Sequence, residues 1–97
     1  MTTITATNRL LIPQHVHTRE FDGELVILDL DKGCYFGLDE VGTRVWQLMS
    51  SGATIAETVE QLGPEYATTR ERMLQDFLSL GNEWLERGLV QLVEESE

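Results

Sequence analysis

The segment Val26–Trp46 constrains the fold more than any other part of the chain. Its sequence, VILDLDKGCYFGLDEVGTRVW, predicts an apolar strand, a tight turn, a second apolar strand and a helix that Asp39 caps. The second strand, Gly33–Leu38, has no obvious later strand to pair with. An apolar sheet edge that stays unpaired is either an aggregation hazard or a docking site. We therefore expect this edge to carry the function of the protein.

The residues before this segment complete a small sheet. Gln14–Glu20 alternates loosely between apolar and polar residues, and the Asp22-Gly23 pair that follows is typical of a hairpin turn. Glu24–Leu30 is nearly continuous in apolar residues, which is typical of a central strand buried on much of both faces. The pattern predicts a three-stranded antiparallel meander with a polar first strand and an apolar third strand at its edges.

Three helices are predicted after the sheet. The first follows Asp39 and ends at Gly52, and the second opens with a capping box at Thr54–Glu57. A second capping box at Thr68–Glu71 predicts the start of the last helix, which should run to about residue 87 before Gly88 ends it. Strands followed by helices predict an α+β fold.

The length of 97 residues predicts one domain, 1–97, with a single modest core. We expect residues 1–9 to be frayed and Arg9–Pro13 to lie against the domain as an extended segment. Leu89–Val93 is long enough for a short terminal strand. Residues 94–97 read as an acidic tail.

The charge balance limits the class of partner. Seventeen acidic side chains face seven basic ones, which gives a net charge of −10. A chain with this charge repels phosphate backbones, so we expect no nucleic acid among its partners. No apolar run approaches the length of a membrane span, and we expect no membrane contact.

Three polar or reactive side chains are candidates for metal binding or catalysis. His15 and His17 share one strand face and could hold part of a metal site, but no third ligand stands at a recognisable spacing. Cys34 is the only cysteine, so a disulfide within the chain is excluded. No general base stands beside Cys34 in the sequence, so nothing suggests that its thiol acts as a nucleophile. We expect no enzyme activity, no metal and no cofactor. Because no secretory signal is visible, the expected compartment is the cytoplasm.

The pair Tyr35-Phe36 lies on the apolar third strand. Adjacent strand residues point to opposite faces, so one ring should pack on the core and the other should be partly exposed. An exposed aromatic residue on a free edge is a suitable anchor for a strand added from another chain.

The last helix is apolar over a broad arc. One stripe contains Met73, Phe77, Leu80 and Trp84, and a neighbouring stripe contains Leu74, Leu78, Gly81 and Leu85. One stripe is enough to bury the helix, so the second is either core or the wall of a groove. A glycine inside a helix costs about 1 kcal/mol relative to alanine. Close approach of another backbone at Gly81 would explain that cost, as would a contact inside the domain.

The run LDLDKGCYFGLDEVGTRVWQLMSSG at residues 28–52, followed by LERGLV at residues 85–90, resembles the PqqD-like family. Family members carry a similar run with a Tyr-Tyr pair and an Asn before the helix, where this chain has Tyr35-Phe36 and Asp39. The resemblance covers about residues 24–93, most of the chain.

The resemblance implies a small winged-helix-like domain of the kind called a RiPP recognition element, after ribosomally synthesised and post-translationally modified peptides. Such a domain binds the leader segment of a precursor peptide, which joins as a strand beside the third strand and lies against the third helix. On this basis we expect leader contacts at Gly33, Cys34, Tyr35, Phe36, Leu74, Phe77, Leu78, Gly81 and Leu85.

Within this family the chain is most similar to the leader-binding protein of lasso peptide biosynthesis, which passes the precursor to a separate leader peptidase. The nearest alternative is a precursor-peptide chaperone of the pyrroloquinoline quinone (PQQ) pathway. A winged-helix DNA-binding regulator is a further alternative, although the last helix is not net basic, as a DNA reader would be. A small enzyme that uses Cys34 is a third alternative.

Overall fold

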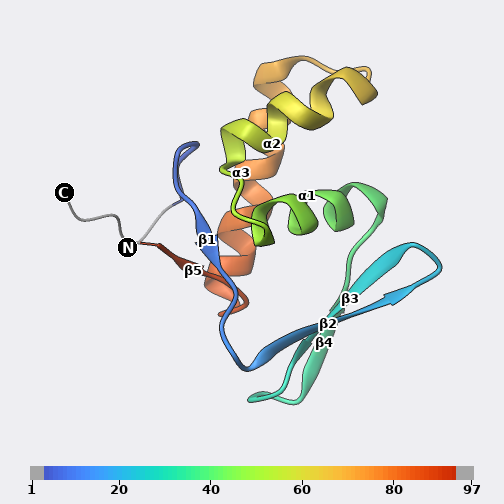
Figure 1. Cartoon of the computed structure of the whole chain (residues 1–97), viewed down its shortest axis with the longest axis vertical. Coiled ribbons are helices and arrows are strands. Elements are labelled where there is room, and N and C mark those ends of the chain that lie inside the picture. Colours follow the sequence, from blue (N-terminus) through green and yellow to red (C-terminus); the bar gives the residue numbers. More distant parts are fainter. Residues whose placement is uncertain (1–3, 94–97) are drawn as a thin grey trace.

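The computed structural model describes residues 4–93, and the predicted acidic tail lies outside this range. A three-stranded antiparallel sheet comprises β2 (Val16–Phe21), β3 (Glu24–Asp29) and β4 (Cys34–Gly37), with β3 in the centre. The helices α1 (Glu40–Ser50), α2 (Ile55–Leu62) and α3 (Arg70–Glu86) follow, with a 3₁₀ turn η1 (Gly63–Glu65) between the last two. The predicted α+β fold, three strands and then three helices, is confirmed (Figure 1).

Two further strands join the ends of the domain. β1 (Leu10–Leu11) and β5 (Gln91–Leu92) pair antiparallel and form a separate two-stranded sheet, which lies beside α3 in Figure 1. Leu10 is opposite Leu92, and the Val93 amide donates to the Arg9 carbonyl at 3.0 Å. The terminal strand predicted at 89–93 is present, and its partner is the extended segment predicted at 9–13.

Asp29 holds the turn that places β4. Its side chain is buried, and its Oδ1 accepts hydrogen bonds of 3.1 Å from the amides of both Asp31 and Lys32. The Gly33 amide donates to the Asp29 carbonyl at 2.9 Å, and Gly33 has a φ of 70°, which glycine adopts without strain. This turn fixes the direction in which the chain enters β4.

The core lies between the inner face of the sheet and the helices. Trp46 of α1 and Trp84 of α3 meet edge to face, with ring centroids 5.0 Å apart. Ile27 of β3, Val45 of α1 and Ile55 of α2 are fully buried. The backbone amide of Leu25 donates to the buried Thr43 hydroxyl at 3.0 Å, which ties β3 to α1.

Two of the three helix starts predicted from the sequence agree with the structure. Asp39 caps α1 through the Gly42 amide, and Thr54 and Glu57 form the expected capping box of α2. The capping box predicted at Thr68–Glu71 is wrong by one residue. Thr69 caps α3 by accepting from the Arg72 amide, because Thr69 is the last residue with extended backbone angles.

The segment before β1 differs from the frayed one that we expected. Ile4 is only 3% exposed, and its amide donates to Asn82 Oδ1 of α3 at 2.8 Å. The Ala56 amide of α2 donates to the Ala6 carbonyl at 2.9 Å. Arg9 donates to the Gly52 carbonyl and lies 3.2 Å from the Glu57 carboxylate. Residues 4–9 therefore cover one flank of α2 and α3.

Candidate functional site

The free edge of β4 is the first component of the candidate site. In an antiparallel ladder the residues of one strand alternate between hydrogen-bonded pairs and outward-facing positions. The Leu38 amide donates to the Leu25 carbonyl at 2.8 Å, which makes this pair hydrogen-bonded. With the observed register, Phe36 and Cys34 then bond to β3. Tyr35 and Gly37 direct their N–H and C=O groups to the open edge.

The side chains of β4 follow the predicted alternation. Tyr35 is 74% exposed on the outer face of the sheet, whereas Phe36 is partly buried and packs against the core. Cys34 is half-buried beside Asp29 on the inner face. Of the four residues chosen from the sequence here, Cys34 and Phe36 have backbones bonded to β3 and the Gly33 amide is bonded to Asp29, so only Tyr35 faces the open edge. Gly37 was missed, although alternation from Tyr35 would have identified it.

The C-terminal end of α3 lies beside β4. The guanidinium carbon of Arg87 is 4.9 Å from the centroid of the Phe36 ring, a cation–π distance. Lys32, in the turn before β4, donates to the Arg87 carbonyl at 3.5 Å. Glu83 Oε1 lies 3.8 Å from Arg87 Nη2. Charged side chains of Lys32, Glu83 and Arg87 therefore gather where this end of the helix meets the edge strand.

Helical spacing identifies the flank of α3 that faces β4. Residues 76, 80, 83 and 87 are three or four positions apart and form one row. Arg87 of this row contacts β4, and Leu80 of this row lines a pocket that Asp39, at the end of the β4–α1 link, also lines. Leu80 was assigned to the core stripe from the sequence, but it is half-buried here.

The opposite flank contains the helix residues that we assigned to the groove. Gly81 is buried, and a Cβ added to it would lie 3.1 Å from Ile4 Cδ1 and 3.7 Å from Ile55 Cδ1. Leu74, Leu78 and Leu85 are half-buried against the core. The close approach expected at Gly81 is made by Ile4 within the domain. The structure therefore fits the second explanation for Gly81, a contact inside the domain, and the expected leader contact at this position stays a prediction.

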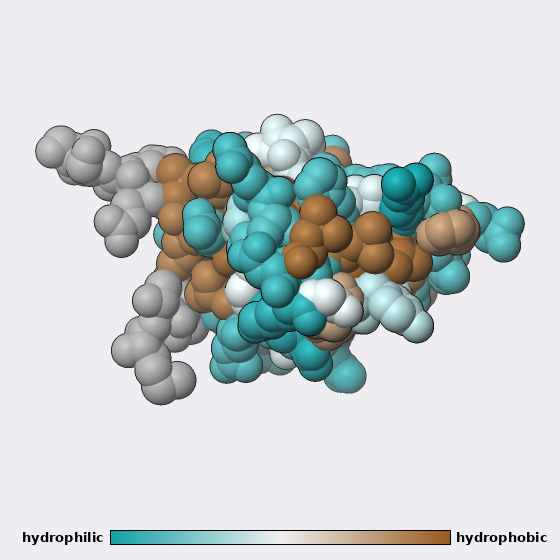
Figure 2. Space-filling model, turned by 90° about the horizontal axis from the view of Figure 1, so that it is seen from below, coloured by the Kyte–Doolittle hydropathy of each residue, from teal (hydrophilic) through white to brown (hydrophobic). Residues whose placement is uncertain are grey.

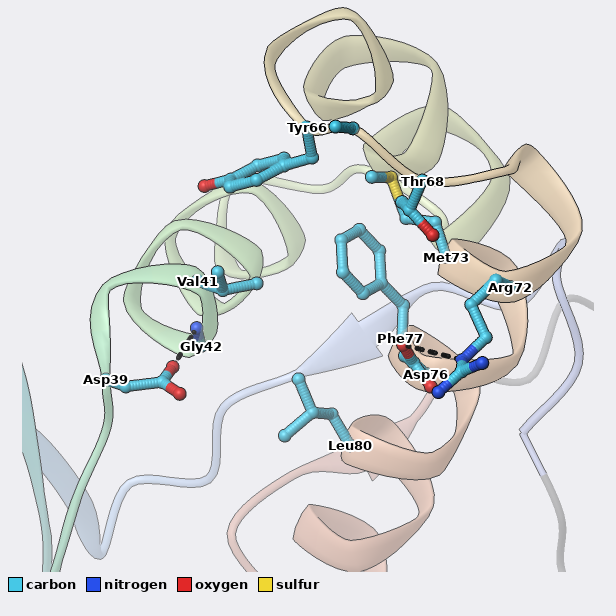
Figure 3. A pocket seen from close by; sticks show the side chains of 11 residues that line it. Asp39, Val41, Gly42, Tyr66, Thr68, Arg72, Met73, Asp76, Phe77 and Leu80 are labelled. Carbon is cyan, nitrogen blue, oxygen red and sulfur yellow. Dashed lines mark hydrogen bonds and ion pairs between the residues drawn. The ribbon is translucent and has the colours of Figure 1, made fainter.

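A pocket of about 740 Å³ lies between α1 and α3, next to the end of β4. Its apolar lining comes from Val41, Tyr66, Met73, Phe77 and Leu80, and Asp39, Arg72 and Asp76 stand at its rim. In Figure 3 the Phe77 ring lies in the middle of this space, between α1 on one side and α3 on the other. Phe77, chosen from the sequence, thus reaches a cavity, although it is only 3% exposed.

The outer face of the sheet has an apolar patch that no part of the described chain covers, beside the polar side chains of His17 and Arg19 of β2. Of the four large hydrophobic side chains that are exposed among residues 4–93, Phe21 at 61% and Tyr35 at 74% lie on this sheet, and Leu30 at 60% directly follows β3. Val26 and Leu28 of β3 fill the space between them and are half-buried. Figure 2, the view from below, shows hydrophobic side chains interrupting the hydrophilic surface over this region.

The candidate side chains for metal binding or catalysis do not come together within residues 4–93. His15 Nδ1 lies 3.7 Å from Asp31 Oδ2, and His17 is exposed on the outer face. In that range no group of three or more His, Cys, Asp or Glu side chains is arranged to hold a metal ion. The helices in the same range are all too short or too polar to span a bilayer.

Comparisons with known proteins agree with this geometry. The family model of coenzyme PQQ synthesis protein D (PqqD) matches residues 24–90. A solved structure described as TbiB1 in complex with the TbiA(beta) leader peptide is 31% identical, with a TM-score of 0.79, and the match covers 87% of this chain and 98% of that one.

A second solved structure, lasso peptide synthetase B1 complexed with the leader peptide, has a TM-score of 0.81 at 22% identity. The match covers 86% of this chain and 98% of that one, and it supports the fold alone. No curated protein sequence matches the chain. Because the family model spans more than half of the chain and the 31% identical structure covers 87% of it, this protein belongs to the PqqD family.

Proposed function

We propose that this protein is a RiPP recognition element that binds the leader of a ribosomally synthesised precursor peptide, in lasso peptide biosynthesis. The leader adds a strand to the open edge of β4 and lies against the flank of α3 that contains Leu80 and Arg87. The observation that carries the proposal is the uncovered edge, where Tyr35 and Gly37 offer two N–H and two C=O groups beside that flank. Both structural relatives are described as complexes with leader peptides.

In strand addition, affinity and selectivity come from different contacts. Main-chain hydrogen bonds to Tyr35 and Gly37 accept any non-proline sequence, and pockets for alternate side chains choose among sequences. In this model the choice falls to the α3 row that contains Leu80, Glu83 and Arg87, of which Arg87 contacts Phe36 of the edge strand. A net charge of −10 favours capture of a basic leader or a basic partner.

Amide hydrogen exchange tests this model, with a synthetic lasso precursor leader as the probe. Leader binding should slow exchange at the Tyr35 and Gly37 amides, which are open in the free protein. The Phe36 amide, already bonded to β3, serves as the internal control and should change little. Binding without new protection at Tyr35 and Gly37 would exclude strand addition at this edge.

The second part of the proposal is that the protein is non-catalytic and delivers the bound leader to a separate leader peptidase. The apolar outer face of the sheet supports this part, since it is continuous with β4 and contains Phe21, Leu28 and Leu30 in addition to Tyr35. Monomeric proteins rarely expose large apolar patches without a partner. Pairing of two copies through this face would bring two chains of charge −10 together, so a different protein is the better occupant.

The alternative of a PQQ pathway chaperone is favoured by one observation, the match to the PqqD family model. The two functions differ in the leader that is bound. Titration with a lasso precursor leader and with a PQQ precursor peptide, under the same conditions, distinguishes them. The proposal predicts tighter binding of the lasso leader.

A further inference from the structure

Two cationic side chains lie next to the edge strand, in a chain whose net charge is −10. Lys32 lies in the turn before β4, and Arg87 follows α3 with its guanidinium over the Phe36 ring. Lys32 Nζ donates to the Arg87 carbonyl, so the two cations belong to one cluster. Within residues 4–93 no carboxylate forms an ion pair with Lys32. Both side chains are exposed, so a ligand at the edge can reach them.

The carboxylates around this cluster have other partners or approach it only loosely. Asp29 is buried and accepts hydrogen bonds from two backbone amides, and Asp31 Oδ2 lies 3.7 Å from His15 Nδ1. Glu83 Oε1 lies 3.8 Å from Arg87 Nη2, which is near the upper limit of an ion-pair distance. The cluster can therefore accept one further carboxylate from a ligand.

Strand pairing determines which side chain of an added peptide reaches this cluster. Residues directly opposite each other on paired strands share a face, with Cβ atoms about 4.5–5.5 Å apart. The peptide residue opposite Phe36 therefore points to the inner face of the sheet, where Arg87 lies over the ring. The peptide residues opposite Tyr35 and Gly37 point to the outer face, away from Arg87.

The backbone ladder alone does not fix the position of the peptide along β4. Within this strand only Tyr35 and Gly37 offer outward N–H and C=O groups, so few hydrogen bonds hold the peptide in place. A slip of one residue turns every side chain to the other face, but a slip of two residues keeps each side chain on its face. The main-chain hydrogen bonds are equivalent after a two-residue slip, so a side-chain contact has to select the register.

We infer that Lys32 and Arg87 fix the register of the leader by binding one acidic side chain, on the leader residue directly opposite Phe36. The inference rests on the proposed function and deepens it, because it assigns a charge preference to one leader position. Elsewhere the acidic protein repels a carboxylate, since its net charge is −10. The same leader side chain is therefore attracted in the correct register and repelled in the others, which gives specificity.

A charge scan of the leader tests this inference. Each residue of a synthetic lasso precursor leader is replaced in turn by Glu and, in a second series, by Gln, which has nearly the same shape without the charge. Affinities are measured by fluorescence anisotropy at low salt on the wild type, Lys32→Gln and Arg87→Gln. Arg19→Gln is the matched control, because Arg19 is an exposed cation on β2 and its loss changes the net charge equally.

On the wild type, Glu should bind about threefold to fivefold more tightly than Gln at one leader position, as expected of a single exposed ion pair. At the two adjacent positions, whose side chains point outward, Gln should bind at least as tightly as Glu. The preference for Glu should disappear in Arg87→Gln, decrease in Lys32→Gln and persist in Arg19→Gln. It should also be lost at about 1 M salt, where the screening length is about 3 Å.

A scan in which no leader position prefers Glu would overturn the inference, and so would a preference that survives in both Lys32→Gln and Arg87→Gln. An equal loss of the preference in Arg19→Gln would assign the effect to net charge and would also overturn it. In each of these cases, leader-dependent protection of the Tyr35 and Gly37 amides would show that strand addition still occurs. Absence of both leader binding and amide protection on the wild type would refute the proposed function itself.

Discussion

The guanidinium of Arg87 lies 4.9 Å from the centre of the Phe36 ring, so the end of α3 is joined to the edge strand of the sheet. Phe36 in turn packs on the core, and its backbone bonds to β3. Together with the hydrogen bond from Lys32 to the Arg87 carbonyl, this contact holds the end of α3 against β4. It links the position of a helix terminus to the strand that a leader would extend.

Arg87→Ala should weaken leader binding several-fold, because it removes the cation that joins α3 to Phe36 beside the edge. The cost to stability should be small, about 0.5–1 kcal/mol for an exposed cation–π contact. Fluorescence anisotropy with the labelled leader and thermal melting check the two effects. Arg70→Ala is the control, since Arg70 pairs with Glu60 at the other end of α3. Equal losses of affinity in both variants would contradict a local role for Arg87.

Tyr35→Pro should abolish strand addition while the domain stays folded. Proline removes an N–H that points to the open edge, and proline is tolerated on edge strands whose N–H faces solvent. Tyr35→Ala removes the ring but keeps the N–H, so the difference in affinity between the two variants measures the backbone bond. Calorimetric titration checks affinity, and circular dichroism checks the fold. A folded Tyr35→Pro variant with unchanged affinity would refute the model.

Gly81→Leu should lower stability and leave leader affinity unchanged in the folded protein. The added side chain meets Ile4 and Ile55, and overpacking of this kind costs about 1–3 kcal/mol, partly offset by about 1 kcal/mol of helix propensity. Ile4→Ala alone should cost about 2 kcal/mol. The double variant should be more stable than the sum of the single changes predicts, since the removed side chain makes room. Weaker leader binding at an unchanged melting temperature would instead place the leader on this flank.

The double variant Phe21→Ser, Leu30→Ser should lose binding to the leader peptidase and keep its affinity for the leader. Both side chains are largely exposed on the outer face, so the fold should tolerate their removal. Leu11→Ser, an exposed leucine on β1, serves as the control. Peptidase binding is measured by surface plasmon resonance with the leader at saturating concentration. Unchanged peptidase binding would exclude this face as the docking surface.

Glu57→Gln should reduce the loss of stability in acid. The Thr54 backbone amide and the Arg9 side chain bond to the Glu57 carboxylate and lower its pKa from the ordinary value of 4.5. A lowered folded-state pKa gives stability that is present above about pH 4.5 and is lost as the pH falls through the folded pKa. The melting temperature of the wild type should therefore fall more steeply below pH 4.5 than that of Glu57→Gln. Parallel curves for the two proteins would contradict a role for this carboxylate.

Local signals in the sequence were sufficient for most of the elements. Asp22-Gly23, Asp39 and the Thr54–Glu57 box act on the backbone within three or four residues, so each could be interpreted without a partner. The shift of the last cap from Thr68 to Thr69 shows the limit of such signals. Both residues can cap, and the backbone angles of the loop decide between them.

The candidate site was only partly predictable, because its walls come from distant segments. Strand alternation alone predicts the apolar edge and the exposure of one ring of the Tyr35-Phe36 pair, and the structure shows that the exposed ring is Tyr35. Helical periodicity gives two flanks of α3 but does not say which neighbour covers each. That choice depends on Ile4, whose contact with Gly81 spans most of the chain and leaves no local pattern. The Arg87–Phe36 contact was missed for the same reason.

The pairing of β1 with β5 also bears on how the domain can be engineered. Leu10 lies opposite Leu92, so the first and last strands of the described chain are adjacent and antiparallel, and residues 4–9 pack on α2 and α3 before β1 begins. Domains with this arrangement tolerate insertion into a host loop and circular permutation, because a short linker can bridge the two points. The domain can thus be inserted into a host protein through β1 and β5. The peptide-binding edge of β4 belongs to the other sheet and lies away from the two junctions.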